Sequence, residues 1–142
     1  MLVSIVIRTL NEARYLGQLL EGIRQQVREG FDVETVVIDS GSEDETVAIA
    51  REHGCVITSI RREEFSFGRS LNLGCEAASG DILVFVSGHC VPTDEHWLGR
   101  LCAPVMAGEV GYAYGRQIGG SESRFSECRM FELALADLDE GA

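Results

Sequence analysis

Short runs of apolar, largely β-branched residues alternate along the chain with segments whose apolar residues recur at helical spacing. Continuous apolar runs of this kind are typical of strands in a parallel sheet that helices cover on both faces. The predicted strands comprise residues 2–7, 33–38, 55–60, 82–86 and 110–114. The predicted helices comprise residues 12–28, 42–53, 68–79 and 94–103. The alternation predicts a three-layer α-β-α domain with a mostly parallel, Rossmann-like sheet.

Local signals set the expected ends of these helices. Ser42–Glu45 has the Ser-x-x-Glu pattern of a capping box, and Thr93 is a candidate cap for the helix that follows it. Gly54 suits the position just after a helix, and His53 is interpreted as a cation at the same helix end. Pro104 is expected to end the fourth helix, because proline cannot continue the backbone hydrogen bonding.

Polar residues directly follow three of the predicted strands, in the segments Arg8–Glu12, Asp39–Ser42 and Ser87–Pro92. Parallel sheets bind ligands beyond the carboxyl ends of their strands, so these segments are the candidate binding loops. Each segment also has an explanation without a ligand. The first can be a helix cap, the second a polar turn, and the third a loop whose histidine is hydrogen-bonded locally. Arg8 fits such an alternative least well, because a guanidinium at this place can hold a phosphate through two hydrogen bonds.

The charged residues exclude several classes of function. The chain of 142 residues has 23 acidic and 12 basic side chains, a net charge of −11, which argues against broad binding to nucleic acid or anionic membranes. All twelve basic residues are arginine. A chain without lysine cannot be a P-loop protein, a protein kinase or a pyridoxal-phosphate enzyme, since each needs a lysine.

The cysteines predict a reducing, cytoplasmic setting without a disulfide framework, because their number is odd and no Cys-x-x-Cys is present. They are Cys55, Cys75, Cys90, Cys102 and Cys128. No apolar run reaches the roughly 18 residues of a membrane span, and the first residues lack the basic start of a signal peptide. A zinc site is an alternative use of some of these thiols, although the spacing matches no common zinc pattern. Its ligands would be His89, Cys90, His96 and Cys102.

Arginine and phenylalanine gather before and within the third predicted helix. Arg61, Arg62 and Arg69 flank Phe65 and Phe67. In so acidic a chain, several arginines near one sheet edge favour a local anion site, and solvated loop charge is the alternative for the first two. The two phenylalanines are interpreted as packing anchors rather than as groups that stack on a base.

The end of the sequence differs from the rest. Gly119 and Gly120 interrupt the pattern, and apolar residues then recur at helical spacing over Ser123–Leu138. We expect an amphipathic C-terminal helix that packs on the sheet or on a partner, including a second copy of the chain. Residues 1–118 are therefore the expected ligand-binding half, and residues 119–142 the linker and helical tail.

Four segments occur in an order and spacing that resemble the inverting family 2 glycosyltransferases with the GT-A fold. They are VSIVIRTLNE (3–12), VVIDSGSEDET (36–46), FSFGRSLNLG (65–74) with GDIL (80–83), and YGRQ (114–117). The resemblance covers residues 2–117. Within the family, the chain looks closest to bacterial enzymes of the rhamnosyltransferase-like subset, which implies a role in polysaccharide biosynthesis.

The resemblance implies a domain that binds a nucleoside diphosphate-sugar with Mn²⁺ or Mg²⁺ and transfers the sugar, with inversion, to a glycan or lipid-linked acceptor. The implied nucleotide-sugar site comprises Arg8, Thr9, Asn11, Glu12, Asp39, Ser40, Arg69, Ser87 and His89. Of these, Arg8, Thr9 and Glu12 fall on the base and ribose side. Asp39 falls on the carboxylate that contacts base or ribose, and Arg69 falls near the diphosphate.

The chain departs from the family pattern at two site positions. Ser40 replaces the second acid of a common Asp-Asp pair. Ser87-Gly88-His89 stands where the family has the metal-binding Asp-x-Asp, so His89 is the expected metal ligand, and an imidazole suits Mn²⁺ better than Mg²⁺. A metal-independent site with His89 as a hydrogen-bond donor is the alternative. The family's acceptor half extends further, so we expect a chain truncated before that half, with its general base and other catalytic residues unidentified.

Two interpretations compete with that of a donor-binding enzyme domain. In the first, the chain is a non-catalytic binding or assembly module that a partner chain or a second copy completes. In the second, it is a flavodoxin-like or response-regulator-like domain. A response-regulator receiver uses a lysine near its phosphorylated aspartate, and the chain has no lysine.

Overall fold

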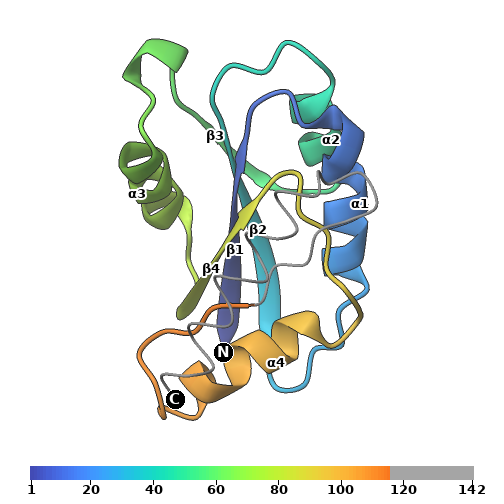
Figure 1. Cartoon of the computed structure of the whole chain (residues 1–142), viewed down its shortest axis with the longest axis vertical. Coiled ribbons are helices and arrows are strands. Elements are labelled where there is room, and N and C mark those ends of the chain that lie inside the picture. The colour runs from blue at the N-terminus through green and yellow to red at the C-terminus, as the bar shows by residue number, and fades with distance from the viewer. Residues whose placement is uncertain (116–142) are drawn as a thin grey trace, which may run out of the picture. The chain divides into compact units, whose positions relative to one another are not determined.

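The computed structural model describes residues 1–115, in which strands and helices alternate in the predicted order (Figure 1). The strands are β1 (Leu2–Thr9), β2 (Asp32–Asp39), β3 (Val56–Ser59) and β4 (Ile82–Ser87). The helices are α1 (Ala13–Arg24), α2 (Thr46–Glu52), α3 (Phe67–Ala77) and α4 (Trp97–Met106), with a short 3-10 turn, η1, at Arg62–Glu64. The chain divides into two compact units, residues 1–111 and 112–142, and all of these elements belong to the first.

The four strands form one parallel sheet in the order β3-β2-β1-β4. β1 is central and pairs with β2 on one side and with β4 on the other. At its carboxyl end, Thr9 lies beside Asp39 and Arg8 lies beside Ser87. The register therefore brings all three predicted binding loops to one edge of the sheet.

Helices cover both faces of the sheet. On one face, Ile5 of β1 is buried in a cluster with Leu16 of α1, Ala50 of α2 and Leu98 of α4. The buried residues of α1 follow the predicted apolar stripe, and they are Leu16, Leu19, Leu20 and Ile23. Figure 1 shows α3 on the side of the sheet opposite to α1. The three-layer α-β-α arrangement with a parallel sheet is confirmed.

On the second face, a glycine allows α3 to approach the sheet closely. Val6 and Ile38 are fully or almost fully buried there, with Leu73 of α3 against them. A Cβ atom on Gly74 would overlap Cγ1 of Val6 and would lie 2.7 Å from Cδ1 of Ile38. The absence of a side chain at position 74 therefore sets the distance between α3 and the sheet.

Replacing Gly74 with alanine should lower the free energy of unfolding by about 1–3 kcal/mol, the usual cost of overpacking a core. Gly17 is the matched control, because it lies within α1 and a Cβ there would meet no atom within 4 Å. Alanine at position 17 should stabilise the chain by up to about 1 kcal/mol through helix propensity. Urea unfolding followed by circular dichroism measures both. Equal effects at the two positions would contradict the packing argument.

Four predicted helix ends are wrong. α1 ends at Arg24 rather than at residue 28. α2 begins at Thr46 rather than Ser42, because the Ser42 hydroxyl bonds to Asp39 while Asp44 accepts the Thr46 backbone N–H at 2.9 Å. α4 begins at Trp97 with His96 at its cap, so Thr93 caps nothing there. The same helix continues through Pro104 to Met106, because a proline in the final turn removes only one backbone donor. Gly54, with φ at +72°, follows α2 as predicted.

The predicted fifth strand at residues 110–114 is also wrong, since residues 110–115 adopt neither helix nor strand. Gly111 and Gly115 within and beside this segment disfavour an extended ladder. The predicted C-terminal helix, its proposed pairing in a homodimer and the boundary at residue 118 lie outside the described residues.

The described chain contains free thiols at Cys55, Cys75, Cys90 and Cys102. Burial raises the pKa of the Cys55 thiol to about 11, which keeps it protonated and unreactive. None of the helices in residues 1–115 combines the length and apolar character that crossing a membrane requires.

Candidate functional site

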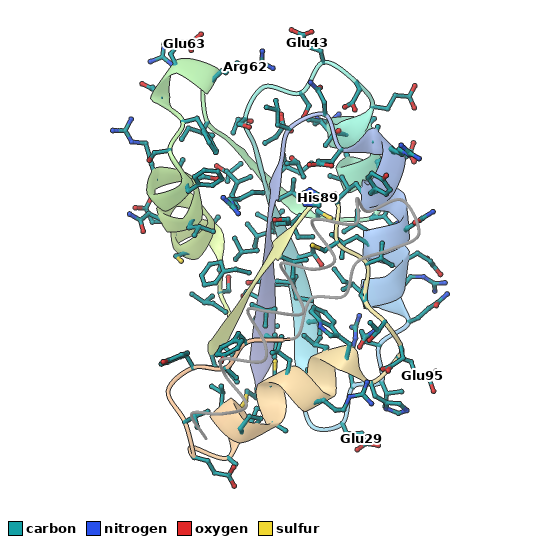
Figure 2. All side chains as sticks on the ribbon, in the orientation of Figure 1. Glu29, Glu43, Arg62, Glu63, His89 and Glu95 are labelled. Carbon is teal, nitrogen blue, oxygen red and sulfur yellow. The ribbon has the colours of Figure 1, made fainter. Side chains whose placement is uncertain are left out.

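The loops after β2 and β4 are joined by backbone hydrogen bonds to the end of β1 at the carboxyl edge of the sheet. The N–H of Ser40 donates to the carbonyl of Thr9 at 3.1 Å, and the N–H of Gly88 donates to the carbonyl of Arg8 at 3.1 Å. Figure 2 shows His89 at this edge, beyond the end of β4 and beside the start of α1. Eight of the nine predicted site residues belong to these three loops or the adjoining strand ends. Arg69, in the first turn of α3, is the exception.

Asp39 organises the loops from within. Its side chain is only 4% exposed, and one carboxylate oxygen, Oδ1, accepts the hydroxyls of Thr9 at 2.8 Å and Ser42 at 2.5 Å. The other, Oδ2, accepts the backbone N–H groups of Gly41 at 3.1 Å and Ser42 at 2.9 Å. A carboxylate has about four acceptor positions, so these contacts use its full capacity. Asp39 therefore holds the loop after β2 in shape, while the Ser40 hydroxyl donates to the Thr9 carbonyl at 3.1 Å.

Asn11 links the loop after β1 to the loop after β2. It adopts a left-handed backbone conformation, with φ at 52°, which asparagine tolerates better than most residues. Its N–H donates to the Ser42 hydroxyl and its side-chain oxygen accepts the N–H of Glu43, both at 2.8 Å. Asn11 therefore acts as a bridge between two loops and does not cap α1, whose N-cap residue is Glu12. Its predicted contact with the ligand stays a prediction.

The start of α1 is held by polar residues just before and at the first position of α2. The N–H of Glu12 donates to the Thr46 hydroxyl at 2.8 Å, and the N–H of Ala13 donates to Asp44 at 3.1 Å. Hydrogen bonds from Thr46 and Ala13 lower the pKa of the Asp44 carboxyl, the Thr46 hydroxyl having the largest effect. The backbone around Glu12 is thus fixed in place.

Glu12 and His89 form the one pair of titratable side chains that links β1 to β4 at this edge in the described residues. Nδ1 of His89 lies 3.2 Å from Oε1 of Glu12, and the histidine side chain is 60% exposed. With a proton on Nδ1 donated to Glu12, the second ring nitrogen, Nε2, is an acceptor. A histidine oriented by a carboxylate in this way is the common form of a metal-binding histidine.

Gly88 allows this pair to form. A Cβ atom at position 88 would lie 3.0 Å from Cγ of Glu12 and 3.1 Å from the carbonyl oxygen of Arg8. A side chain at position 88 would therefore displace its neighbours by a few tenths of an ångström, Glu12 among them.

Within residues 1–115, no three histidine, cysteine, aspartate or glutamate side chains are arranged to hold a metal ion. The alternative zinc site of His89, Cys90, His96 and Cys102 is therefore wrong, and Cys102 lies in the core. Burial also raises the pKa of the Cys90 thiol, which opposes the thiolate that zinc requires. An imidazole oriented by a carboxylate still fits Mn²⁺ or Mg²⁺ where phosphate oxygens complete the coordination.

The arginines near α3 differ in their contacts. Arg61 pairs with Glu64 at 2.8 Å, and Nη1 of Arg69 donates to the Glu64 carbonyl at 3.1 Å. The guanidinium carbon of Arg8 lies 4.6 Å from the centre of the Phe67 ring. Phe67 is 66% exposed, so the interpretation of this ring as a packing anchor is wrong.

Sequence reasoning missed two residues that shape the site. Thr46 lay within a predicted helix, and its hydroxyl also holds the backbone of Glu12 at the start of α1. Phe67 was interpreted as a packing anchor, and its exposed ring instead lies against Arg8. The available signal was the concentration of short polar side chains in residues 39–46, more than one capping box requires.

The parallel sheet with helices on both faces is a Rossmann-like α/β domain of the GT-A class. The sequence model of "Glycosyl transferase family 2" matches residues 4–131. The chain therefore belongs to glycosyltransferase family 2, as the sequence motifs predicted.

Individual relatives agree with this assignment. The chain is 32% identical to a glucosyl-3-phosphoglycerate synthase of Petrotoga mobilis over 85% of its length, and 27% identical to the O-antigen chain rhamnosyltransferase RfbN of Salmonella typhimurium over 83%. Among solved structures, glucosyl-3-phosphoglycerate synthase from Mycobacterium tuberculosis in complex with Mn²⁺, UDP and glucosyl-3-phosphoglycerate matches 75% of the chain with a TM-score of 0.62 and 30% identity. The chain spans about two fifths of the length of each of these proteins.

Proposed function

We propose that the carboxyl edge of the sheet binds a nucleoside diphosphate-sugar, and that this chain supplies the donor-binding part of an inverting glycosyltransferase. The Glu12–His89 pair is the observation that carries the proposal, because it places an oriented imidazole where β1 and β4 end. Crystals of the M. tuberculosis relative with UDP and Mn²⁺ support the choice of ligand. The sugar acceptor we propose is a glycan or a lipid-linked sugar.

His89 would hold the divalent metal ion through Nε2, and Glu12 would orient the ring from the opposite side. The metal would supply positive charge to the diphosphate that leaves. Because the described residues offer so few ligands, the metal should bind well only together with the nucleotide, whose phosphate oxygens complete its coordination. Mn²⁺ is the better candidate, since an imidazole is a softer ligand than a carboxylate.

In the reaction, the acceptor hydroxyl attacks the anomeric carbon as the bond to the diphosphate breaks. The loops that Thr9, Asn11, Asp39 and Ser40 fix together would receive the base and ribose. Ser87, beside Arg8 in the sheet register, and Arg69 would lie on the diphosphate side. These residues would bind and orient the donor, and we assign neither the acceptor site nor the base that takes the acceptor's proton to the described residues.

Thermal unfolding of the full chain tests the proposal, with UDP, GDP and dTDP, each with and without Mn²⁺. A ligand that binds the folded state at a hundredfold excess over its Kd stabilises that state by about 2.7 kcal/mol. We expect a rise in Tm with at least one nucleotide, larger with Mn²⁺ present. An unchanged Tm with every nucleotide and metal combination would contradict the proposal.

Replacing Gly88 with alanine should weaken metal-dependent nucleotide binding by about tenfold, because the new methyl group presses on Glu12 and displaces it from His89. Gly99, within α4, is the matched control, since a Cβ there would meet no atom within 4 Å. Calorimetric titration with the nucleotide identified above measures both variants. Wild-type affinity in the position-88 variant would show that the close approach is not needed.

A further inference from the structure

Arg8 is a positively charged side chain without an acidic partner in a strongly acidic protein. The chain has 23 acidic residues, yet none of those in the described part forms an ion pair with Arg8. The residue is half-buried near the carboxyl end of β1, and its backbone lies beside Ile38 on one side and Ser87 on the other. Its charge is therefore held at the carboxyl edge and is not neutralised there.

Phe67 holds this charge in one place. The guanidinium carbon lies 4.6 Å from the centre of the Phe67 ring, within the range of a cation–π contact. The ring is itself supported by Phe65, at a centroid distance of 5.3 Å and an interplanar angle of 72°. Phe67 is 66% exposed and belongs to neither core cluster, so the fold gains little from a phenylalanine at this position.

The neighbouring arginines are used differently. Arg61 pairs with Glu64, and Arg69 donates to the Glu64 carbonyl. Arg61 and Arg69 thus contact oxygen atoms, whereas the guanidinium of Arg8 contacts the face of an aromatic ring in the described structure. A ring contact leaves the in-plane N–H donors of a guanidinium available, and two of them match the spacing of phosphate oxygens.

The position of Arg8 relative to His89 indicates what those donors bind. The backbone N–H of Gly88 donates to the Arg8 carbonyl, and His89 is the next residue along the chain. The backbones of Arg8 and His89 are therefore close to each other. The Arg8 side chain reaches Phe67 at the start of α3, whereas His89 lies beside Glu12 at the start of α1. Arg8 therefore reaches the α3 face at the end of β1, and His89 lies on the α1 face. Of the parts of a nucleoside diphosphate-sugar, the diphosphate carries the negative charge that an unneutralised guanidinium binds best.

We propose that Phe67 is a positioning residue that presents the Arg8 guanidinium to the diphosphate of the bound donor. The proposal rests on the proposed function, since it names a phosphate-binding group and its support within the same site. Phe67 contributes through Arg8 and makes no contact of its own with the base. Arg8, previously placed on the base and ribose side, is thereby assigned to the diphosphate.

Calorimetric titration of the full chain tests the proposal, with Mn²⁺ present and with UDP, inorganic pyrophosphate and uridine as probes. The Phe67→Leu variant should bind UDP and pyrophosphate about two- to fivefold more weakly, the usual effect of an exposed cation–π contact. Phe67→Tyr should keep wild-type affinity, because the ring is retained. Arg8→Gln should lose about tenfold or more, since charge-assisted hydrogen bonds are lost. Uridine should bind all variants equally.

A double-mutant cycle separates positioning from a general structural effect. If Phe67 acts through Arg8, the variant with both Arg8→Gln and Phe67→Leu should bind UDP no more weakly than Arg8→Gln alone. Phe85→Leu is the matched control, because Phe85 is a 50% exposed phenylalanine on β4, and its affinity should equal that of wild type.

Each failure has a distinct meaning. Absence of UDP binding to the wild-type chain, with GDP and dTDP also silent, overturns the proposed function itself. Normal binding by wild type together with unchanged affinity in Phe67→Leu overturns the positioning role. Additive losses in the cycle, or an equal loss for uridine, would show that Phe67 acts independently of Arg8 and would overturn the proposal as well.

Discussion

Replacing Asp39 with alanine should lower the free energy of unfolding by about 3 kcal/mol. The substitution removes a buried carboxylate that accepts four hydrogen bonds, and it leaves two backbone N–H groups and two hydroxyls without this acceptor. Hydrogen bonds to charged groups contribute about 1.5–3 kcal/mol each, and buried donors that lose their partner add a desolvation cost. Nucleotide affinity should fall by more than tenfold in the same variant, because the loops after β1 and β2 lose their common support.

Asp32→Ala is the matched control for this substitution. Asp32 is an exposed aspartate at the opposite end of the same strand, β2, and its replacement should change stability by less than about 0.5 kcal/mol. Urea unfolding measures stability, and calorimetric titration with a nucleoside diphosphate measures affinity. If Asp39→Ala were as stable as Asp32→Ala, the hydrogen bonds around Asp39 would not organise the site.

Replacing His89 with alanine should weaken metal-dependent binding of the nucleotide by more than tenfold and leave stability within about 0.5 kcal/mol of wild type. The side chain is 60% exposed and belongs to no core cluster, so its loss opens no cavity. Its one polar side-chain contact in the described structure is with Glu12. Metal-dependent affinity and stability are therefore expected to separate.

His96→Ala is the corresponding control. His96 is 56% exposed and also lies beside an acid, with Nε2 at 3.4 Å from Glu95, but it caps α4 away from the candidate loops. Titration of each variant with the nucleotide at several Mn²⁺ concentrations gives the comparison. Equal losses in the two variants would assign the effect to surface charge, whereas an unchanged metal requirement in His89→Ala would remove His89 from the metal site.

Much of the fold could be predicted because its central strand is buried on both faces. Ile5 and Val6 point to opposite cores, so β1 has to be apolar throughout, and such a run is easily recognised. Pro104 and residues 110–114 show where this reasoning fails. A proline breaks a helix only where the lost donor matters, and an apolar run becomes a strand only where another strand pairs with it.

The location of the site could be predicted more fully than its internal contacts. Parallel strands place their carboxyl ends at one edge, which is why the loops containing Thr9, Asp39 and His89 were selected together. The inward orientation of Asp39 depends on hydroxyls from Thr9, thirty positions earlier, and from Ser42. Such a contact depends on the register between strands. The exposure of Phe67 was missed for a related reason, since an aromatic residue is expected in a core until its charged partner is known.

Backbone amide NMR spectra of the full chain, recorded with a nucleoside diphosphate and substoichiometric Mn²⁺, test the central claim most directly. Paramagnetic Mn²⁺ broadens the signals of nearby amides and so reports the position of the metal. We predict that broadening begins in residues 8–12, 39–42 and 87–90, requires the nucleotide, and is lost in His89→Ala. Broadening centred on the acidic segment at residues 94–96, or present without nucleotide and unaffected by His89→Ala, would contradict a nucleotide and metal site at the carboxyl edge of the sheet.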